Sequence, residues 1–192
     1  MVEHKNTKEL LADSIKELAK SKSVEKISVR EIVSNAGLTH MTFYNHFRNK
    51  YELIAWIYNV RICPSLGQLW SGVSWREAVR HFVDVLFEEP DFYMNVLKNT
   101  YGETSVRYAS NNFAIDMILE RMRCTPELGN PSKETIFFVK FYMRAISESI
   151  NDWFLNGRHI PVEQFIDMLV SAMPVKLVPF FSDSAAVCSS SD

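Results

Sequence analysis

The segment GLTHMTFYNHFRNK, residues 37–50, lies near the amino terminus of a 192-residue chain and carries its strongest structural signals. Glycine readily adopts the left-handed backbone conformation that closes a helix, so Gly37 predicts that one helix ends just before it. Thr39 then offers a hydroxyl group that caps a new helix. We therefore expect a short helix at about residues 40–46, joined to the preceding helix by a tight turn.

The preceding helix begins at a capping pattern. Ser28 and Glu31 stand three residues apart in the order S-x-x-E. In this pattern the serine hydroxyl accepts a hydrogen bond from the first helical turn, and the glutamate reaches back to the cap. A helix over residues 29–35 follows, and apolar residues spaced three and four apart predict another over residues 6–22. Two short helices and a glycine turn, braced by a first helix, are typical of a helix-turn-helix that enters the major groove of DNA.

The second short helix is expected to expose an unusual set of side chains. Phe43 and Phe47 lie four residues apart on one face and are expected to pack inward. The remaining faces carry hydroxyl, imidazole and amide groups, and a lysine starts the next helix. Such donors suit the phosphate oxygens of nucleic acid. On this ground the expected DNA-binding residues are Thr39, His40, Met41, Thr42, Tyr44, Asn45 and Lys50.

At these residues the sequence resembles the TetR family of bacterial transcriptional regulators. The spacing T-x-Y-x-H-F-x-x-K after the glycine turn carries the resemblance. It implies one group of residues that hold phosphates and a second group that lies where base edges are read. The phosphate group is Thr42, Tyr44, His46 and Lys50. The base group is Arg30, His40 and Met41. Relatives often carry other residues at the His40-Met41 pair, so the resemblance transfers no operator sequence.

The rest of the chain is predicted to be helical. Only 6 Gly and 7 Pro occur in the whole sequence, too few for the usual turns of an open sheet or a sandwich. Apolar periodicity and helix-ending residues indicate six further helices, followed by an irregular end at Pro174 and Pro179. These helices run from Asn49 to Pro64, Trp75 to Phe87, Phe92 to Lys98, Val106 to Arg123, Ser132 to Leu155 and Pro161 to about Met173.

The expected fold class is all-α, with a three-helix DNA-binding head and a carboxy-terminal helical bundle that dimerises. We predict a helix-turn-helix domain over residues 1–52 and a ligand-binding and dimerisation domain over residues 53–181. Residues 182–192 are small and polar, and we expect a flexible tail there. The start of the first helix, at Lys5 and Thr7, is either a solvated face or a further contact to the DNA backbone.

The helix that ends at Leu155 is apolar on two sides, and such a helix is buried on two sides. One side is the stripe from Val139 to Trp153, and Phe137, Phe141 and Ala145 mark the other. The chain's own core covers one of these sides, and a symmetric copy is the simplest cover for the other. The resemblance likewise implies that the last two helices of each protomer build a dimer interface. The expected interface residues are Val139, Met143, Ile146, Ile150, Trp153, Phe165, Ile166 and Leu169.

Charge and cysteine content limit the class of protein. The formal net charge is −2, but residues 1–50 hold nine basic and six acidic side chains, which leaves −5 for the remainder. A basic amino-terminal part on an acidic body suits a protein that meets a polyanion at one end. The three scattered cysteines predict neither a disulfide framework nor a zinc site. Without an apolar leader or a long apolar run, we expect no membrane partner and a cytoplasmic location.

The sequence contains none of the common catalytic or cofactor-binding motifs of enzymes. It lacks a phosphate-binding loop, a dinucleotide glycine signature, a nucleophile elbow and an H-E-x-x-H metal motif. His81 and Asp84 stand three apart on one helix, but two such residues often occur together by chance. We therefore predict no enzyme activity, no cofactor and no metal site.

The function predicted from these patterns is a homodimeric regulator, a repressor, that binds a pseudo-palindromic operator in double-stranded DNA. An unknown effector bound in the body then releases it. The body is rich in large aromatic side chains, which suits either an apolar pocket or an ordinary core, and no ligand residue is singled out. Residues 141–142, 150–157 and 161–163 resemble the branch that includes regulators of dihydroxyacetone kinase operons. Because members of that branch can depend on a coactivator protein, control by a protein partner is the alternative.

Overall fold

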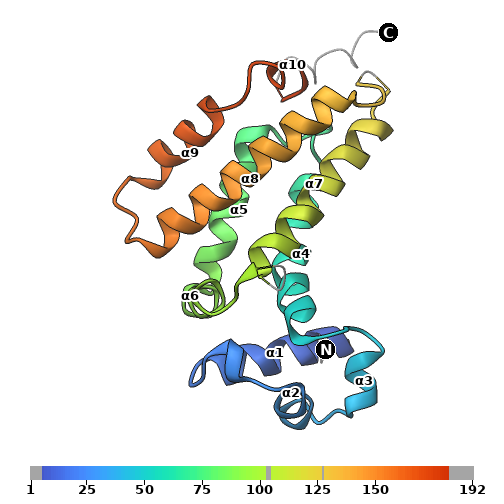
Figure 1. The fold of residues 1–192 in the computed structure, drawn as a ribbon, viewed down its shortest axis with the longest axis vertical. Helices are drawn as coiled ribbons and strands as arrows, with labels where there is room; N and C mark the ends of the chain where they lie inside the picture. The colour runs from blue at the N-terminus through green and yellow to red at the C-terminus, as the bar shows by residue number, and fades with distance from the viewer. Residues whose placement is uncertain (1–5, 103–104, 127, 182–192) are drawn as a thin grey trace. The chain divides into compact units, whose positions relative to one another are not determined.

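The computed structural model describes residues 6–102, 105–126 and 128–181, and this part of the chain is helical (Figure 1). It holds ten α-helices and one short 3-10 helix, and within the described residues there is no β-strand. The chain forms two compact units: the described residues up to Tyr58 together with Glu89–Ser110, and Asn59–Glu88 together with the described residues from Asn111 onward. The all-α prediction is confirmed.

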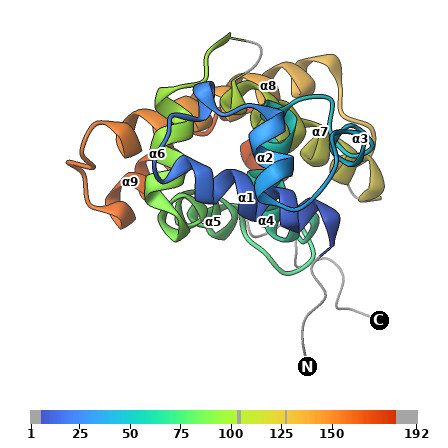
Figure 2. The same ribbon diagram turned by 90° about the horizontal axis from the view of Figure 1, so that it is seen from below.

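The first unit contains the predicted helix-turn-helix (Figure 2). Its helix α1 packs on α2 and on α6, and α2 packs on α3. A buried apolar core joins them, with Ile15, Ile32 and Phe43 fully enclosed. The elements are α1 (Thr7–Ala19), η1 (Val24–Lys26), α2 (Val29–Asn35), α3 (His40–Tyr44), the start of α4 (Lys50–Gly67), α6 (Pro90–Lys98) and the start of α7 (Val106–Cys124).

The predicted start of α2 is confirmed by its hydrogen bonds. The Ser28 hydroxyl accepts from the backbone N–H of Glu31 at 3.2 Å, and the Ser28 N–H donates to the Glu31 carboxylate at 2.8 Å. Lys22 adds an ion pair to that carboxylate at 2.6 Å. The Ser28 hydroxyl also donates to the carboxylate at 2.7 Å. The lysine, followed by the Ser28 N–H and then the Ser28 hydroxyl, lowers the pKa of Glu31 to about 2. The helix ends as predicted before Gly37, whose φ is 66°.

The second unit is built around α5, α8 and α9. The hydroxyl group of Tyr142 on α8 accepts from the indole N–H of Trp75 at 3.2 Å and donates to the carbonyl of Leu169 at 2.8 Å, which ties the three helices together. Burial raises the pKa of Tyr142 to about 12, although the hydrogen bond from Trp75 acts in the opposite direction. The elements are the end of α4, α5 (Trp75–Glu88), the remainder of α7, α8 (Lys133–Leu155), α9 (Val162–Ser171) and α10 (Val178–Phe181).

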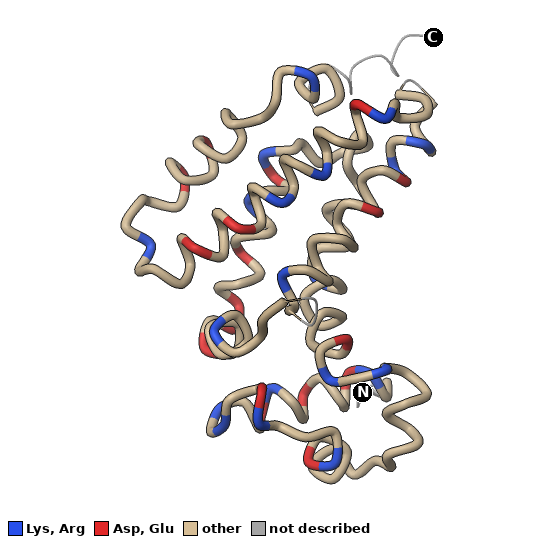
Figure 3. Tube along the Cα trace, in the orientation of Figure 1, with Lys and Arg blue, Asp and Glu red and all other residues tan. Residues whose placement is uncertain are grey.

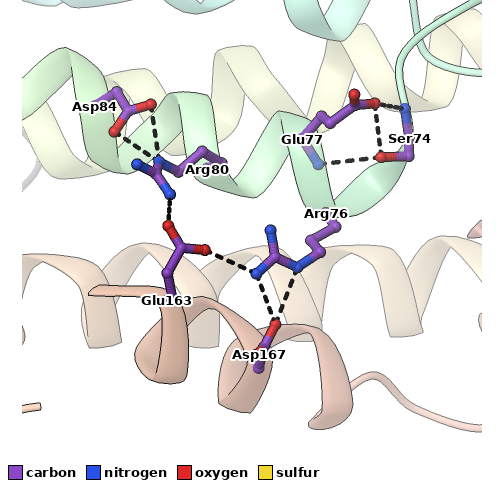
Figure 4. A network of polar contacts seen from close by, with 7 residues as sticks. All are labelled: Ser74, Arg76, Glu77, Arg80, Asp84, Glu163 and Asp167. Carbon is purple, nitrogen blue, oxygen red and sulfur yellow. Dashed lines mark hydrogen bonds and ion pairs between the residues drawn. The ribbon is translucent and has the colours of Figure 1, made fainter. Parts of the chain in front are cut away.

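An exposed ion-pair network also links α5 to α9 (Figure 4). Arg76 donates to Glu163 at 2.9 Å and to Asp167 at 3.0 Å, and Arg80 binds both Glu163 and Asp84. The Glu163 carboxylate is therefore shared by two guanidinium groups. Pairs on the surface contribute little individually, but shared acceptors in a network hold a helix in one orientation.

Two predictions about helix ends are wrong. Helix α4 continues through Pro64 to Gly67, although proline cannot donate the usual hydrogen bond. The neighbouring side chains Ile62 and Leu66 are fully buried, and their packing holds the last turn in place.

The end expected to be irregular instead forms α10. Phe181 of this helix packs against Trp75 with 4.8 Å between ring centroids, and the indole N–H of Trp70 donates to the carbonyl of Phe180. Trp70 itself has a left-handed backbone with φ of 63°. Tertiary contacts thus order a turn whose local sequence does not indicate a helix.

The residues of α8 and α9 that were predicted for the dimer interface lie mainly in the core of the chain itself. Of the eight residues expected at the interface, seven are at most 7% exposed within the chain itself, and Trp153 is half-buried and stacks on Phe165 at 4.7 Å. The reason is that α9 folds back on α8 and α5 of the same chain, so this apolar stripe belongs to its own core. Phe137 and Phe141, on the other face, are 61% and 58% exposed. The seven buried residues are Val139, Met143, Ile146, Ile150, Phe165, Ile166 and Leu169.

The compact units also differ from the predicted segments in one respect. The first unit extends to Tyr58 and takes in Glu89–Ser110, which the sequence analysis assigned to the body. The functional boundary at residue 52 stays a prediction. The predicted tail, residues 182–192, and Lys5 lie outside the described residues.

Candidate nucleic-acid interface

Helix α3 presents the predicted recognition face to solvent. Met41 is 71% exposed and Tyr44 is 51% exposed, while Phe43 between them is fully buried. His40 and Asn45 are exposed as well. The inward aromatic residue fixes the rotation of this short helix, because it packs in the core of the first unit. The polar and aromatic groups on the outward side are free of the core and accessible to a ligand.

Helix α3 begins at a hydroxyl pair. The Thr39 side chain accepts from the backbone N–H of Thr42 at 3.1 Å, and the two hydroxyl groups lie 2.8 Å apart. This is the predicted cap, and it gives α3 its starting direction immediately after the Gly37 turn. Thr39 is exposed and Thr42 is half-buried, so the capping hydroxyls lie at the surface.

Two rings on the outward side of α3 contact each other. His40 and Tyr44 lie one helical turn apart, with 5.2 Å between ring centroids and an interplanar angle of 60°. Tyr44 also touches the edge of buried Phe43 at 5.4 Å. The contacts restrict the rotamers of His40 and Tyr44 and place an imidazole beside a phenol. Both groups donate hydrogen bonds, which suits either phosphate oxygens or base edges.

Lys50 has internal partners that sequence reasoning did not reveal. Its ammonium group donates to the carbonyl oxygens of Glu25 at 2.5 Å and Ile27 at 2.7 Å. Partial burial lowers the pKa of this lysine. Two of its three N–H donors therefore stabilise the backbone that precedes α2, which leaves one for a phosphate. No sequence pattern predicts these hydrogen bonds, since the acceptors are backbone carbonyl oxygens more than twenty residues upstream.

The remaining predicted residues lie on the surface of the same unit. Arg30, in the first turn of α2, and His46, just after α3, are both exposed. Lys8 on α1, which the prediction did not include, lies 5.8 Å from the ring centroids of both Phe47 and Trp56. This cation–π arrangement holds a basic group at the end of the 37–50 stretch. Only the folded chain identifies which lysine of α1 lies there.

The described residues do not suggest other chemistry. They contain no group of three or more His, Cys, Asp or Glu side chains placed to hold a metal ion. His81 contacts the carbonyl of Arg61 at 2.8 Å, and Asp84 pairs with Arg80. Among the described helices, none combines the length and apolar character needed to cross a membrane.

An outward-facing short helix after a glycine turn, braced by α1 and α2, defines the helix-turn-helix class of DNA-binding regulators. The family described as "Bacterial regulatory proteins, tetR family" matches residues 11–57, and the one described as "Transcriptional regulator C-terminal region" matches residues 74–174. The chain belongs to the TetR family of bacterial DNA-binding transcriptional regulators, which are not enzymes. The resemblance found in the 37–50 stretch is confirmed.

Individual relatives agree with this assignment. The HTH-type dhaKLM operon transcriptional activator DhaS of Lactococcus lactis subsp. lactis (strain IL1403) is 28% identical over 90 residues, which are 47% of this chain and 48% of that protein. The matched region thus spans about half the length of this curated relative. The resemblance of the body to regulators of dihydroxyacetone kinase operons agrees with this match.

Solved structures share the fold. The dihydroxyacetone kinase operon activator DhaS has a TM-score of 0.53 at 20% identity, over 91% of this chain and 97% of that one. A TetR transcriptional regulator from Rhodococcus sp. RHA1 has a TM-score of 0.58 at 17% identity, over 91% of this chain and 98% of that one. At these identities the likeness extends to the fold alone.

Proposed function

We propose that this protein is a homodimeric repressor that binds a pseudo-palindromic DNA operator and is released by an effector bound in its second unit. DNA binding is supported mainly by the outward face of α3, where His40, Met41 and Tyr44 are exposed. Buried Phe43 holds this helix in position. In this proposal α3 enters the major groove, and the half-sites of a dimer lie about one helical turn apart, roughly 34–36 Å.

The nine residues predicted for DNA binding divide by chemistry. Thr42, Tyr44, His46 and the remaining donor of Lys50 hold phosphates, which fixes the orientation of the head. Thr39 caps α3, and Asn45 lies at its end. Arg30, His40 and Met41 face base edges. A methionine side chain has no hydrogen-bond donor, so Met41 favours an apolar contact such as a thymine methyl group.

The exposed face of α8 supports the homodimer. Phe137 and Phe141 stack with 6.3 Å between their centroids and form an apolar surface. Beyond the first turn, which holds Lys133 and Glu134, basic and acidic side chains are separated along this helix, with Lys140 and Arg144 before Glu148 and Asp152 (Figure 3). Two copies of α8 that cross antiparallel bring the basic part of one beside the acidic part of the other. A two-fold interface needs this self-complementarity.

The experiment that tests the proposal is selection of bound DNA from a random pool with the purified full chain. We expect recovered sequences with two inverted half-sites, and sedimentation at micromolar concentration is expected to give twice the monomer mass. Recovery of single half-sites would contradict the operator symmetry. No enrichment of any sequence would contradict sequence-specific binding.

A second candidate is an activator that works with a protein partner, and it is favoured by the similarity to DhaS, whose name describes an activator. Transcription from a promoter that carries the selected site separates the two. Repression requires higher expression when the gene is deleted, whereas activation requires lower expression. Thermal shift measurements with a panel of metabolites test the small-molecule effector, and a protein partner is indicated if no metabolite shifts the melting temperature.

A further inference from the structure

The side chain of Asn95 on α6 makes long-range contacts that neither the family patterns nor the predicted DNA face account for. Its amide nitrogen donates to the carbonyl oxygens of Ala19 at 2.9 Å and Lys22 at 2.8 Å. Its oxygen accepts from the backbone N–H of Val24 at 3.1 Å and from the side chain of Asn99 at 3.0 Å. Both donors of the side-chain amide, and its acceptor, are thus occupied.

The backbone groups that Asn95 contacts lie at the end of α1 and in the connection from α1 to α2. A helix leaves its last carbonyl groups without partners in the helix, and a connection with little regular structure leaves more. Here the only regular element is η1. Asn95 supplies partners for the last residue of α1, for Lys22 and for the start of η1. It therefore replaces bonds that this connection cannot make by itself.

Lys50 holds the other half of the same connection, through the carbonyl groups of Glu25 and Ile27. The connection that leads into α2 is therefore held by one side chain from α4 and one from α6. Further contacts join α6 to α1, since Lys16 pairs with Glu89 at 2.5 Å and Phe92 is buried. All of these residues lie within the first compact unit.

We infer that Asn95 is a positioning residue for DNA binding, because its amide holds the α1–α2 connection in the conformation that orients α2 and α3. This makes α6 a part of the DNA-binding unit although it lies far downstream in sequence. The inference rests on the proposed function. Helix α6 directly follows α5 of the second unit, and so a change in that unit has a covalent route to the residue that holds the connection.

Two substitutions and a control test the inference. Asn95→Ala removes all contacts of the side chain, and Asn95→Asp keeps the acceptor for Val24 but loses both donors. Lys98→Ala alters an exposed residue of the same helix. DNA affinity is measured with the selected operator at a temperature where circular dichroism shows each variant to be folded. We expect about tenfold weaker binding for both Asn95 variants and wild-type affinity for Lys98→Ala.

A further readout separates positioning from a general loss of stability. Because Asn95 touches no phosphate, the slope of log K against log salt is expected to stay at the wild-type value while the affinity falls. A residue with a merely structural role lowers the melting temperature and leaves the affinity of the folded protein unchanged. That second outcome overturns the inference. Operator binding by the wild type together with unchanged binding by both Asn95 variants overturns it too, whereas absence of binding by the wild type contradicts the proposed function.

Hydrogen exchange on the wild-type protein provides a test that needs no variant to fold. The amides of residues 19–24 and of α6 are expected to gain protection together when operator DNA binds, since both belong to the unit that DNA immobilises. Protection confined to α2 and α3 overturns the inference.

Discussion

At the scale of single residues, the burial of one side chain of α3 determines which of its other side chains are exposed. Phe43 is fully buried and fixes the helix, and this leaves Met41 and Tyr44 on the outside. Lys50 shows that a residue can match a family pattern and still have a second role, since two of its donors bind backbone carbonyls. Removing Lys50 would disturb both roles, so it is a poor probe of phosphate contact alone.

Tyr44→Phe is the cleaner probe of phosphate contact. The phenol ring and its contacts with His40 and Phe43 are retained, and only the exposed hydroxyl is lost. We expect weaker binding to all DNA sequences alike, by about 1 kcal/mol, because one hydrogen bond is removed. The measurement is a fluorescence anisotropy titration against the selected operator and an unrelated duplex. Tyr108→Phe, at an equally exposed tyrosine, is the control. A change in base preference would indicate that Tyr44 reads bases instead.

The carboxylate of Glu31 predicts how the start of α2 responds to pH. Its pKa is lowered to about 2 from an ordinary value of 4.5, and so the folded state favours the ionised form. The resulting stabilisation is present in full above about pH 4.5 and is lost as the pH falls toward 2. We expect Glu31→Gln to lower the melting temperature at pH 7 and to converge with the wild type toward pH 2. Asp116→Asn is the charge-matched control, and an equal decrease at every pH would contradict the assignment.

At the scale of elements, α8 and α9 illustrate how burial is divided inside one chain. The predicted stripe on α8 is real, but α9 and α5 of the same protomer cover it. The Tyr142 hydroxyl lies at the centre of this packing and bonds to α5 and α9 at once. Helices that meet through both apolar contacts and a buried hydrogen-bonded hydroxyl have one preferred arrangement, since a shift leaves polar groups unpaired.

Tyr142→Phe tests this arrangement. The substitution keeps the ring but leaves the indole N–H of Trp75 and the carbonyl of Leu169 without their partner. We expect a loss of about 1–3 kcal/mol in the free energy of unfolding, the cost of unsatisfied buried groups. Urea denaturation followed by tryptophan fluorescence measures it, with Phe138→Leu as a packing control on the same helix. A loss well below that range would mean that water replaces the hydroxyl.

At the scale of the whole molecule, the faces proposed for DNA binding and for assembly are different surfaces of the chain. The proposed DNA face lies on α3 in the first unit, and the proposed dimer face lies on α8 in the second. Beyond the first turn of α8, the basic residues Lys140 and Arg144 are separated from the acidic residues Glu148 and Asp152, which suits a two-fold contact (Figure 3). Each unit has its own buried core. Disrupting the dimer is therefore expected to weaken operator binding without unfolding the head.

Phe141→Glu is the substitution that tests assembly. It places a charge on the exposed ring pair of α8, where it would be desolvated only if a partner covers that face. We expect a monomer in sedimentation and a loss of at least tenfold in affinity for the full operator. Tyr108→Glu, on another exposed aromatic residue, is expected to leave the dimer intact. A dimer that persists in Phe141→Glu would place the interface elsewhere.

Local sequence patterns predict the helix-turn-helix and nearly all helix positions. Caps, glycine ends and apolar periodicity act over a few residues, so Ser28, Gly37 and Thr39 set their helices without help from the rest of the chain. The exposed set on α3 follows from the inward positions of Phe43 on that helix and Phe47 just after it. The folded chain was needed to show which face of α8 is covered, that α4 continues through Pro64, and that Lys50 and Asn95 hold the α1–α2 connection. These features depend on contacts between residues distant in sequence, and a local pattern carries no information about the partner.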